Sequence, residues 1–264
     1  MPLRYDMPVV FGPSLMPDQS RVPKAQVIVV AYETTRDAAA ALLPRFYEIA
    51  ETPVISVSRI DYHGVDYLGN RGYREIVISI AAVYRGAGAP LHAGFAPVMW
   101  VSEPAALISG REFMGFGKLM GEMEPILAEE GQRHFECREY GALLLEGDVS
   151  GMTPLSAEAF DRVRRNSAAV RTFGWKYIAG PDGSPDIDYP TVNLMQWDYQ
   201  RAWSGDGRLV WHRPDALAAP MSSRVVAALA DMPVVQYRRA FVAEGTALIN
   251  RAGTQRLPVP VETT

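Results

Sequence analysis

Strand-forming segments recur along almost the whole chain, and this feature most constrains the fold. The segments are rich in β-branched and aromatic residues, which favour extended backbone. In the stretch Val54–Ile60, Ile55 and Val57 alternate with Ser56 and Ser58, a pattern that predicts one buried and one polar face. Two Gly-Asp clusters, 181–184 and 204–207, have the composition of hairpin turns. The clearest strand segments are 25–32, 53–62, 73–84, 92–101, 135–149, 191–203 and 234–244.

Helical patterns are fewer and short. Residues 34–44 form an alanine-rich run that Thr34 or Thr35 caps and Pro44 ends. A second helix is expected from Ser102, as its N-cap, to about Met114, with Gly115 as the stop, and a third near Ser222. No linker, repeat or low-complexity run interrupts the chain. We therefore expect a single α+β domain over 1–264, dominated by strands with a few flanking helices, and the pattern leaves the strand order open.

Composition and charge exclude several classes of protein. The 264 residues are 48% hydrophobic and 21% charged, which is ordinary for a soluble globular protein. A net charge of −4 gives no electrostatic reason to expect nucleic acid or an anionic membrane as partner. The N-terminus has no apolar run long enough for a signal peptide or a membrane span, so a cytoplasmic location is expected.

Common catalytic motifs are missing. The single cysteine, Cys137, is predicted to be a buried structural thiol, because His134, three residues away on the same strand, would face the other side. The four histidines show no metal-ligand spacing, so neither a metal nor a cofactor is expected. The segment 115–121 lacks a P-loop pattern, since Leu119 stands where the hydroxyl residue belongs, and no Gly-x-Ser-x-Gly elbow is present.

Lys118 is the most informative charged residue. Only three of the 26 basic residues are lysines, and Lys118 lies in Gly-Arg-Glu-Phe-Met-Gly-Phe-Gly-Lys-Leu-Met-Gly, an otherwise largely apolar segment. Lysine differs from arginine in that it can lose its proton, and an amine surrounded by apolar side chains is favoured in its neutral form. A neutral amine is a nucleophile that forms a Schiff base with a carbonyl. The alternative is a surface lysine whose ammonium reaches water from a glycine-rich loop.

This segment resembles the lysine segment of the acetoacetate decarboxylase superfamily. Further ordered matches are the stretches 30–49, 72–80, 103–112, 182–185, 202–209 and 229–234, so the resemblance covers nearly the whole chain. It implies a predominantly antiparallel fold whose curved sheets form a barrel- or cone-like cavity, and a homo-oligomeric assembly. It also places Lys118 on the Schiff-base lysine and Glu75 on the glutamate beside the bound substrate.

Three positions depart from the decarboxylases of this family. Leu119 replaces a second lysine, Arg59 stands where a further glutamate occurs, and Ala25 aligns loosely with an arginine. Arg59 would suit a keto-acid carboxylate by bidentate pairing, and its alternative is a strand-face arginine paired with Asp61.

The resemblance, with these departures, favours a Schiff-base carbon–carbon lyase. The expected reaction is aldolase–dehydratase chemistry, in which pyruvate condenses with an apolar aldehyde and water is lost, or its reverse. Lys118 would form the imine and Glu75 would move protons. Met114, Phe116, Leu119 and Met120 are the predicted substrate-binding wall, since methionine adapts to varied shapes. Acetoacetate decarboxylation and a non-catalytic small-molecule binding protein are the alternatives.

Overall fold

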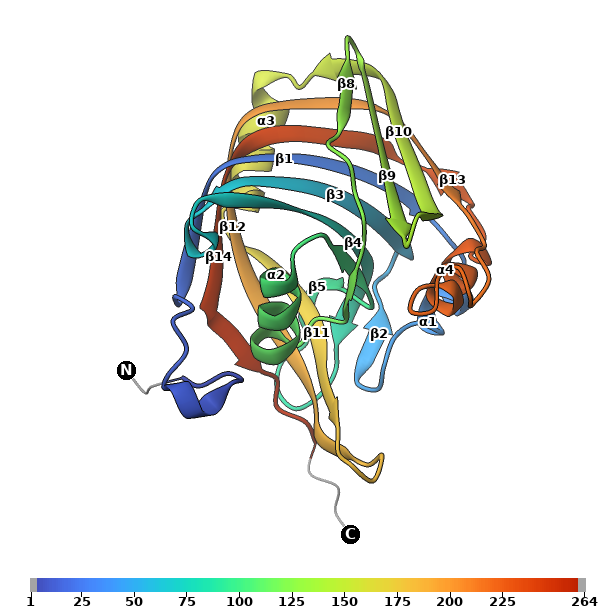
Figure 1. The fold of residues 1–264 in the computed structure, drawn as a ribbon. Coiled ribbons are helices and arrows are strands. Elements are labelled where there is room, and N and C mark those ends of the chain that lie inside the picture. Colours follow the sequence, from blue (N-terminus) through green and yellow to red (C-terminus); the bar gives the residue numbers. More distant parts are fainter. Residues whose placement is uncertain (1–3, 261–264) are drawn as a thin grey trace.

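One large, strongly curved antiparallel sheet makes up most of the molecule. The computed structural model describes residues 4–260, and within them the sheet has 14 strands. Figure 1 shows the longer strands arching around the interior, with helix α2 at the open side below them. The strands are β1 (Gln19–Glu33), β2 (Tyr47–Ile49), β3 (Val54–Val65), β4 (Arg71–Tyr84), β5 (Leu91–Phe95), β6 (Met99–Val101), β7 (Lys118–Met120), β8 (Leu127–Glu129), β9 (Gln132–Glu139), β10 (Ala142–Pro154), β11 (Val170–Ala179), β12 (Pro185–Trp211), β13 (Gln236–Tyr237) and β14 (Arg239–Arg256).

The sheet closes on itself. Its strand order is β11-β5-β4-β3-β1-β14-β12-β10-β9-β8, and β11 also pairs with β12. The long strand β12 makes this possible, because its first half pairs with β11 and its second half with β10. Most pairings are antiparallel, whereas β11–β5 and β6–β7 are parallel. The expected antiparallel, barrel-like architecture is confirmed.

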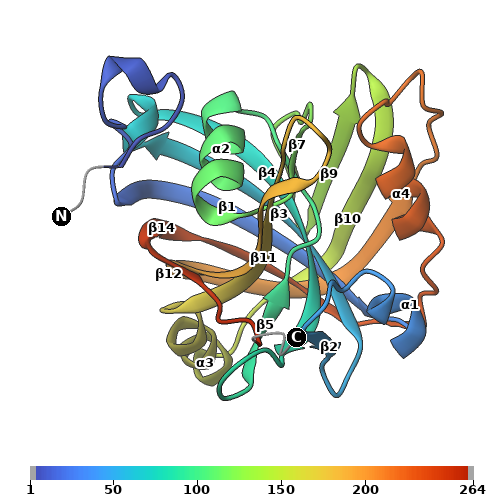
Figure 2. The same cartoon turned by 90° about the horizontal axis from the view of Figure 1, so that it is seen from below.

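Four α-helices of residues 4–260 lie around this sheet. They are α1 (Arg36–Ala40), α2 (Pro104–Ser109), α3 (Ala157–Ser167) and α4 (Ser223–Ala230). In the view from below, α3 and α4 lie on the outside, far from each other (Figure 2). Thr35 caps α1 as expected, because its side chain accepts a hydrogen bond from the Ala38 amide. None of the helices in the described part of the chain is long and apolar enough to cross a membrane.

Several expectations about local structure are wrong. The expected strand 92–101 is two strands, β5 and β6, and the expected strand 135–149 is broken by a turn at 140–141 between β9 and β10. The Ser-Gly-Asp-Gly stretch 204–207 is not a turn but part of β12. The N-cap of α2 is Glu103 rather than Ser102, and the Ser102 hydroxyl instead accepts a hydrogen bond from the Arg74 amide at 2.9 Å. The turn at 181–184 is present between β11 and β12. Helix α3, which the sequence patterns did not predict, follows Ser156 as its N-cap.

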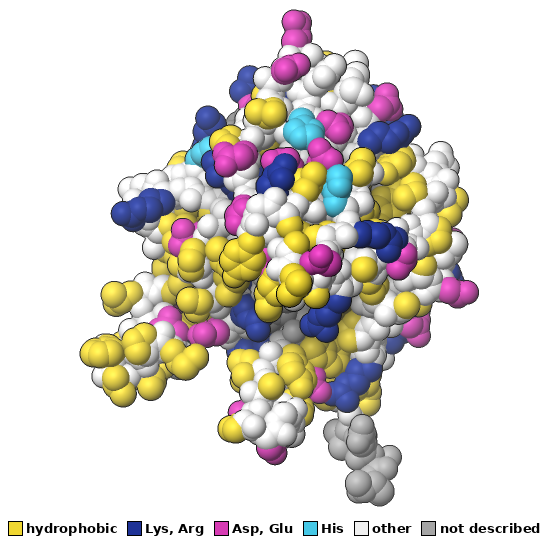
Figure 3. Space-filling view, turned by 45° about the vertical axis from the view of Figure 1, so that its right-hand side comes forward, with side chains coloured by type: hydrophobic (Ala, Val, Ile, Leu, Met, Phe, Trp, Pro, Cys, Tyr) yellow, Lys and Arg dark blue, Asp and Glu magenta, His cyan; other side chains and the backbone are white. Residues whose placement is uncertain are grey.

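Apolar side chains fill both sides of the curved sheet. In β3, Ile55 and Val57 belong to one buried cluster together with Trp100, Phe135 and Cys137. Ile60 and Tyr62, on the opposite face of β3, belong to a second cluster. Charged side chains of both signs are interspersed on the surface that Figure 3 shows. The second cluster surrounds the candidate site.

Candidate active site

A cavity of about 290 Å³ lies inside the closed part of the sheet. Strands β1, β3, β4, β6, β11, β12 and β14 line it together with α2 and the segment that follows α2. Ser56, Ser58 and Ile60 line it from β3, so the polar face predicted from the alternation in β3 is the cavity face. Tyrosines and Trp197 supply much of the remaining wall.

Lys118 and Glu75 meet in this cavity. Lys118 Nζ lies 2.5 Å from Glu75 Oε2, and the two residues are only 6% and 5% exposed. Of the other two lysines, Lys24 is exposed and Lys176 is half-buried. The unusual lysine of the sequence is therefore the buried one, and its amine has a carboxylate partner within hydrogen-bond distance.

Strand pairing explains why these two side chains meet. Glu75 pairs with Val101 of β6, and Lys118 pairs with Met99 of the same strand. Met99 and Val101 are two residues apart, so their side chains point to the same face of the sheet. Because directly paired residues share a face, Glu75 and Lys118 also point to one side, into the cavity.

The chain before Lys118 forms a tight turn that anchors it. Helix α2 continues as a π-helical turn, Gly110–Met114, which ends at Gly115 in the left-handed region with φ of 75°. The Met114 carbonyl accepts hydrogen bonds from Thr191 Oγ1 at 2.8 Å and Asn193 Nδ2 at 3.0 Å. The Phe116 amide donates to the Gly110 carbonyl at 2.9 Å. These bonds fix the start of β7 against β12.

The predicted site residues fall into two groups. Lys118, Glu75, Met114 and Phe116 line the cavity. Leu119 instead packs against the core cluster on the other side of the sheet, because it alternates with Lys118 along β7. Met120 is 44% exposed and does not line the cavity.

Arg59 also lies outside the cavity, contrary to the expected contact with a substrate carboxylate. It shares the face of β3 that carries Ile55 and Val57, and it is fully buried. Arg59 Nη2 lies 2.6 Å from Asp61 Oδ1 and donates to the Glu124 carbonyl at 2.8 Å. The alternative pairing with Asp61 is therefore present, although Asp61 is buried rather than on the surface.

Several cavity residues were not predicted. Tyr62 and Tyr73 stack at 4.6 Å between ring centroids, and Tyr62 also stacks on Trp197 at 6.0 Å. Burial raises the pKa of both Tyr62 and Tyr73 well above the ordinary value, and the nearby Glu75 charge adds to it. Tyr73 could have been found from the sequence, because it precedes Glu75 by two positions on one strand. Arg251, on β14, also lines the cavity, and nothing in the sequence around it marked it as a site residue.

One group of potential metal ligands lies away from the cavity. Ligand atoms of His134, Glu136 and Glu146, on β9 and β10, are all within 4.8 Å of one another. Spacing in the sequence did not reveal this group, because strand pairing brings it together. Glu136 accepts two hydrogen bonds from Arg138, and Glu146 Oε2 lies 2.7 Å from His212 Nε2. These carboxylates therefore already have partners.

Comparisons with known proteins agree with this architecture. The family model described as acetoacetate decarboxylase matches residues 6–247. The chain is 29% identical over 206 residues to acetoacetate decarboxylase 3 of Mesorhizobium japonicum, which covers 78% of this chain and 76% of that protein.

Solved structures share the fold. The acetoacetate decarboxylase of Legionella pneumophila has a TM-score of 0.74 and 20% identity, covering 94% of this chain and 92% of its own. The enduracididine biosynthesis enzyme MppR, solved with the condensation product of pyruvate and imidazole 4-carboxaldehyde, has a TM-score of 0.68 and 16% identity. That alignment covers 98% of this chain and 97% of MppR. The family match spans most of the chain, and the chain therefore belongs to the acetoacetate decarboxylase family.

Proposed function

We propose that this protein is a Schiff-base-forming lyase that condenses pyruvate with an aldehyde and eliminates water, or catalyses the reverse reaction. The observation that carries the proposal is the buried contact of 2.5 Å between Lys118 Nζ and Glu75 Oε2 at the wall of the cavity. Membership of a family of lyases supports it. So does the likeness to MppR, whose structure with a pyruvate condensation product has the same fold.

The chemistry begins with proton transfer and imine formation. Glu75 accepts a proton from the Lys118 ammonium, and the free amine attacks the keto carbon of pyruvate. The keto oxygen takes up one proton from the attacking amine and one that Glu75 returns, and it leaves as water. An iminium forms between Nζ and that carbon, and Glu75 is again a carboxylate. The iminium is an electron sink, so the adjacent methyl group can lose a proton to Glu75 and become a nucleophilic enamine.

Carbon–carbon bond formation and dehydration then follow. The enamine carbon attacks the aldehyde carbonyl, and the resulting alkoxide takes up a proton to give a hydroxyl group. Loss of a second proton from the same carbon, with departure of that hydroxyl as water, gives a conjugated iminium. Hydrolysis of this iminium releases an unsaturated keto acid and regenerates the Lys118 amine. Glu75 is close enough to Nζ to carry the protons in each of these steps.

The cavity wall suits an apolar aldehyde. Met99, Met114 and Phe116 lie on the same wall as Lys118, and Trp197 and Tyr199 stack on each other with ring centroids 5.7 Å apart. Methionine side chains adapt to varied shapes, and aromatic side chains favour planar, apolar acceptors. We therefore expect aromatic aldehydes to be better acceptors than small hydrophilic aldehydes.

Acetoacetate decarboxylation is the second candidate, and the names of the curated relatives favour it. There the iminium of acetoacetate would lose carbon dioxide, and hydrolysis would release acetone. The position after Lys118, which carries a second lysine in the decarboxylases that the sequence resembles, is Leu119 here, and it faces the core. We therefore expect decarboxylation to be slow or absent. A non-catalytic binding protein, the third possibility, would form no imine.

Product analysis separates these candidates. Incubation with pyruvate and benzaldehyde should give a conjugated enone that absorbs in the near ultraviolet, whereas acetoacetate should release little carbon dioxide. Glu75→Gln should lower the rate of condensation by about 100-fold or more, the usual contribution of a general acid–base group. Imine trapping on Lys118 should persist in that variant.

Two outcomes would contradict the proposal. Turnover of acetoacetate at about 10 per second or faster, the typical range for enzymes, would assign decarboxylation instead. If no aldehyde in a broad panel reacts while pyruvate still traps on Lys118, the condensation reaction is wrong and only imine chemistry remains.

A further inference from the structure

A buried arginine, Arg251, lines the same cavity as Lys118. It lies on β14, which is separated from β3 by β1 in the closed sheet, and it is 3% exposed. Neither its position in the sequence nor the resemblance to the family identified Arg251 as a site residue. The cavity thus contains a second buried cation besides Lys118.

The hydrogen bonds of Arg251 are incomplete. Its Nη1 donates to the Pro17 carbonyl at 3.1 Å and to Ser20 Oγ at 2.6 Å. Its Nε is buried and has no partner in the described part of the chain. The guanidinium carbon lies 4.3 Å from the ring centroid of Tyr67, a cation–π contact that shields one face of the group.

Arg251 also lacks a counter-ion. No carboxylate among residues 4–260 lies within 4.0 Å of its guanidinium nitrogens. Burial lowers the pKa of Arg251, and the nearby tyrosines and the charge of Asp66 only partly oppose this effect. Arginine nevertheless keeps its proton in proteins, so the interior holds a positive charge that no carboxylate of these residues pairs directly. Such charges are costly, and buried cations are normally paired with an anion.

Arg59 and Arg251 differ in their partners and in the side of the sheet that they face. Both side chains are buried, yet Arg59 has Asp61 at 2.6 Å and faces the core. Each of the two has one buried nitrogen without a partner in the described residues, Nη1 of Arg59 and Nε of Arg251. Arg251 differs because it lines a cavity large enough for a small ligand and has no paired carboxylate in the described chain. Arg251 therefore lacks an anionic partner within the described part of the protein, and an anion that enters the cavity from solution can supply it.

Tyr67 connects Arg251 to the reacting pair. Burial raises the pKa of Tyr67, the Arg251 charge opposes that rise, and the Glu75 charge adds to it. Tyr73 responds to the same two charges, and all of these side chains line one cavity. The charges of Arg251 and of Glu75 therefore shift the pKa of Tyr67 and of Tyr73 in opposite directions.

We propose that Arg251 binds the carboxylate of the keto acid whose carbonyl carbon reacts with Lys118. This inference rests on the proposed imine chemistry and assigns the substrate a negative charge. The Nη2 group, which makes no hydrogen bond in the described part of the chain and is not among the solvent-inaccessible atoms, supplies the donor on the cavity side. Tyr67 holds the planar guanidinium in place. The site selects small keto acids over neutral ketones, a role that the sequence had suggested for Arg59.

The test compares a keto acid with a neutral ketone. Pyruvate and acetone are each titrated in the presence of borohydride, and the reduced adduct is measured by intact-protein mass. In Arg251→Met the pyruvate concentration for half-maximal trapping should rise about 100-fold, as expected when one partner of a buried charge pair is removed. Acetone trapping should change by less than about threefold, a difference of under 1 kcal/mol that is small beside the loss of a charge pair.

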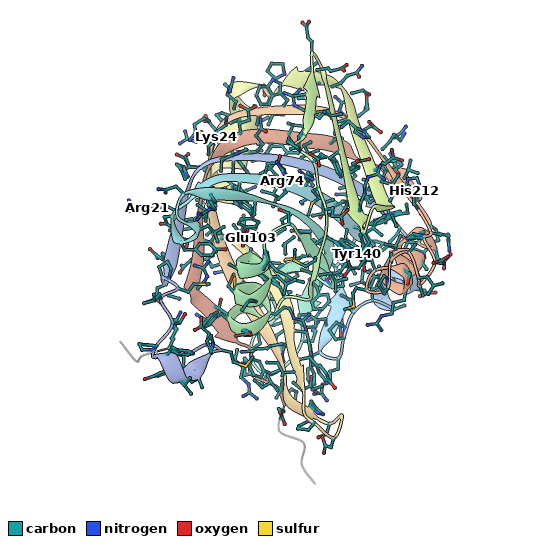
Figure 4. All side chains as sticks on the ribbon, in the orientation of Figure 1. Arg21, Lys24, Arg74, Glu103, Tyr140 and His212 are labelled. Atoms are coloured by element: carbon teal, nitrogen blue, oxygen red, sulfur yellow. The ribbon has the colours of Figure 1, made fainter. Side chains whose placement is uncertain are left out.

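Two control variants complete the design. Arg251→Lys keeps the charge without the planar fork and should lose less pyruvate selectivity than Arg251→Met. Arg21→Met changes an exposed arginine near the start of β1, which Figure 4 shows at the outside of the molecule. In this variant the ratio of the pyruvate to the acetone concentration for half-maximal trapping should equal that of the parent protein. Circular dichroism of each variant reports whether the fold is retained.

The results distinguish this inference from the proposed function. Equal losses for pyruvate and acetone in folded Arg251→Met would mean that Arg251 only anchors Pro17 and Ser20, and would overturn the inference. An unchanged ratio would overturn it as well. If the parent protein traps neither compound, the imine chemistry itself is wrong. Should Arg251→Met fail to fold, folded Arg251→Lys decides: reduced selectivity for pyruvate over acetone supports the inference, and selectivity equal to that of the parent protein overturns it.

Discussion

Gly110 determines where the Lys118 side chain can lie. A Cβ atom at this position would be 2.5 Å from both Cδ and Cε of Lys118, too close for any real contact. Gly110 begins the π-helical turn, and its backbone is in the right-handed helical region with φ of −66°, so alanine would fit the turn itself. The absence of a side chain is therefore needed to make room for the lysine.

Gly110→Ala should consequently reduce imine formation without unfolding the protein. The flexible lysine would move rather than the backbone, and Nζ would leave Glu75. A displacement of about 1 Å at a reacting group costs on the order of 100-fold in rate. Trapping rates with pyruvate measure the effect, and thermal unfolding checks the fold. Ile108→Ala, at an exposed position of the same helix, is the control. An unaltered trapping rate in Gly110→Ala would contradict this account of the turn.

The sequence located Lys118 and Glu75 but not Arg251. Lys118 and Glu75 sit in recognisable local segments. Arg59, predicted to bind a substrate carboxylate, lies instead on the apolar face of β3 with Ile55 and Val57. Arg251 reaches the cavity only because β14 pairs with β1 and β12, and such long-range pairing leaves no mark in local sequence.

At the level of elements, the long strands β1, β3 and β4 were predicted, whereas β11 was missed and β9 and β10 were merged into one strand. The stretch 204–207 has turn composition, yet its glycines are required for close packing within β12. A Cβ on Gly207 would lie 2.8 Å from a methyl group of Val30, and one on Gly205 would lie 2.7 Å from the Ser150 carbonyl oxygen. Glycine thus occurs both in turns and where strands pack closely. Only the pairing of the strands shows which of these roles a given glycine has.

Short and polar helices were the least predictable elements. Helix α3 follows a good N-cap at Ser156 and has Phe160 and Val163 at helical spacing on its packed face, but most of its 11 residues are polar. In α2 two adjacent polar residues competed for the N-cap, and Ser102 is held by the Arg74 amide of the neighbouring β4 instead. Tertiary contacts decided both cases.

For the whole molecule, buried tyrosines predict a loss of stability at high pH. Burial raises the pKa of Tyr32 from 10.0 to about 12, and it also raises the pKa of Tyr62, Tyr73 and Tyr199. The folded state holds these protons more tightly than the unfolded state. Their contribution is complete below about pH 10 and is lost as the pH rises towards 12.

Tyr32 alone should account for about 2–3 kcal/mol of this loss, since each pKa unit corresponds to about 1.4 kcal/mol. Urea unfolding between pH 8 and about pH 11.5 gives the free energy of unfolding, and phenolate absorbance reports ionisation. Tyr32→Phe should be less sensitive to pH than the parent protein. A free energy of unfolding that stays constant across this range would contradict the assigned burial.

The central claim is that Lys118 forms an imine with a small keto acid. Borohydride reduction in the presence of pyruvate, followed by peptide mass mapping, tests it most directly. The account predicts one reduced pyruvate on the peptide that contains Lys118, full labelling in Lys24→Ala, and no labelling in Lys118→Ala. Absence of an adduct, or an adduct that persists in Lys118→Ala, would contradict the claim.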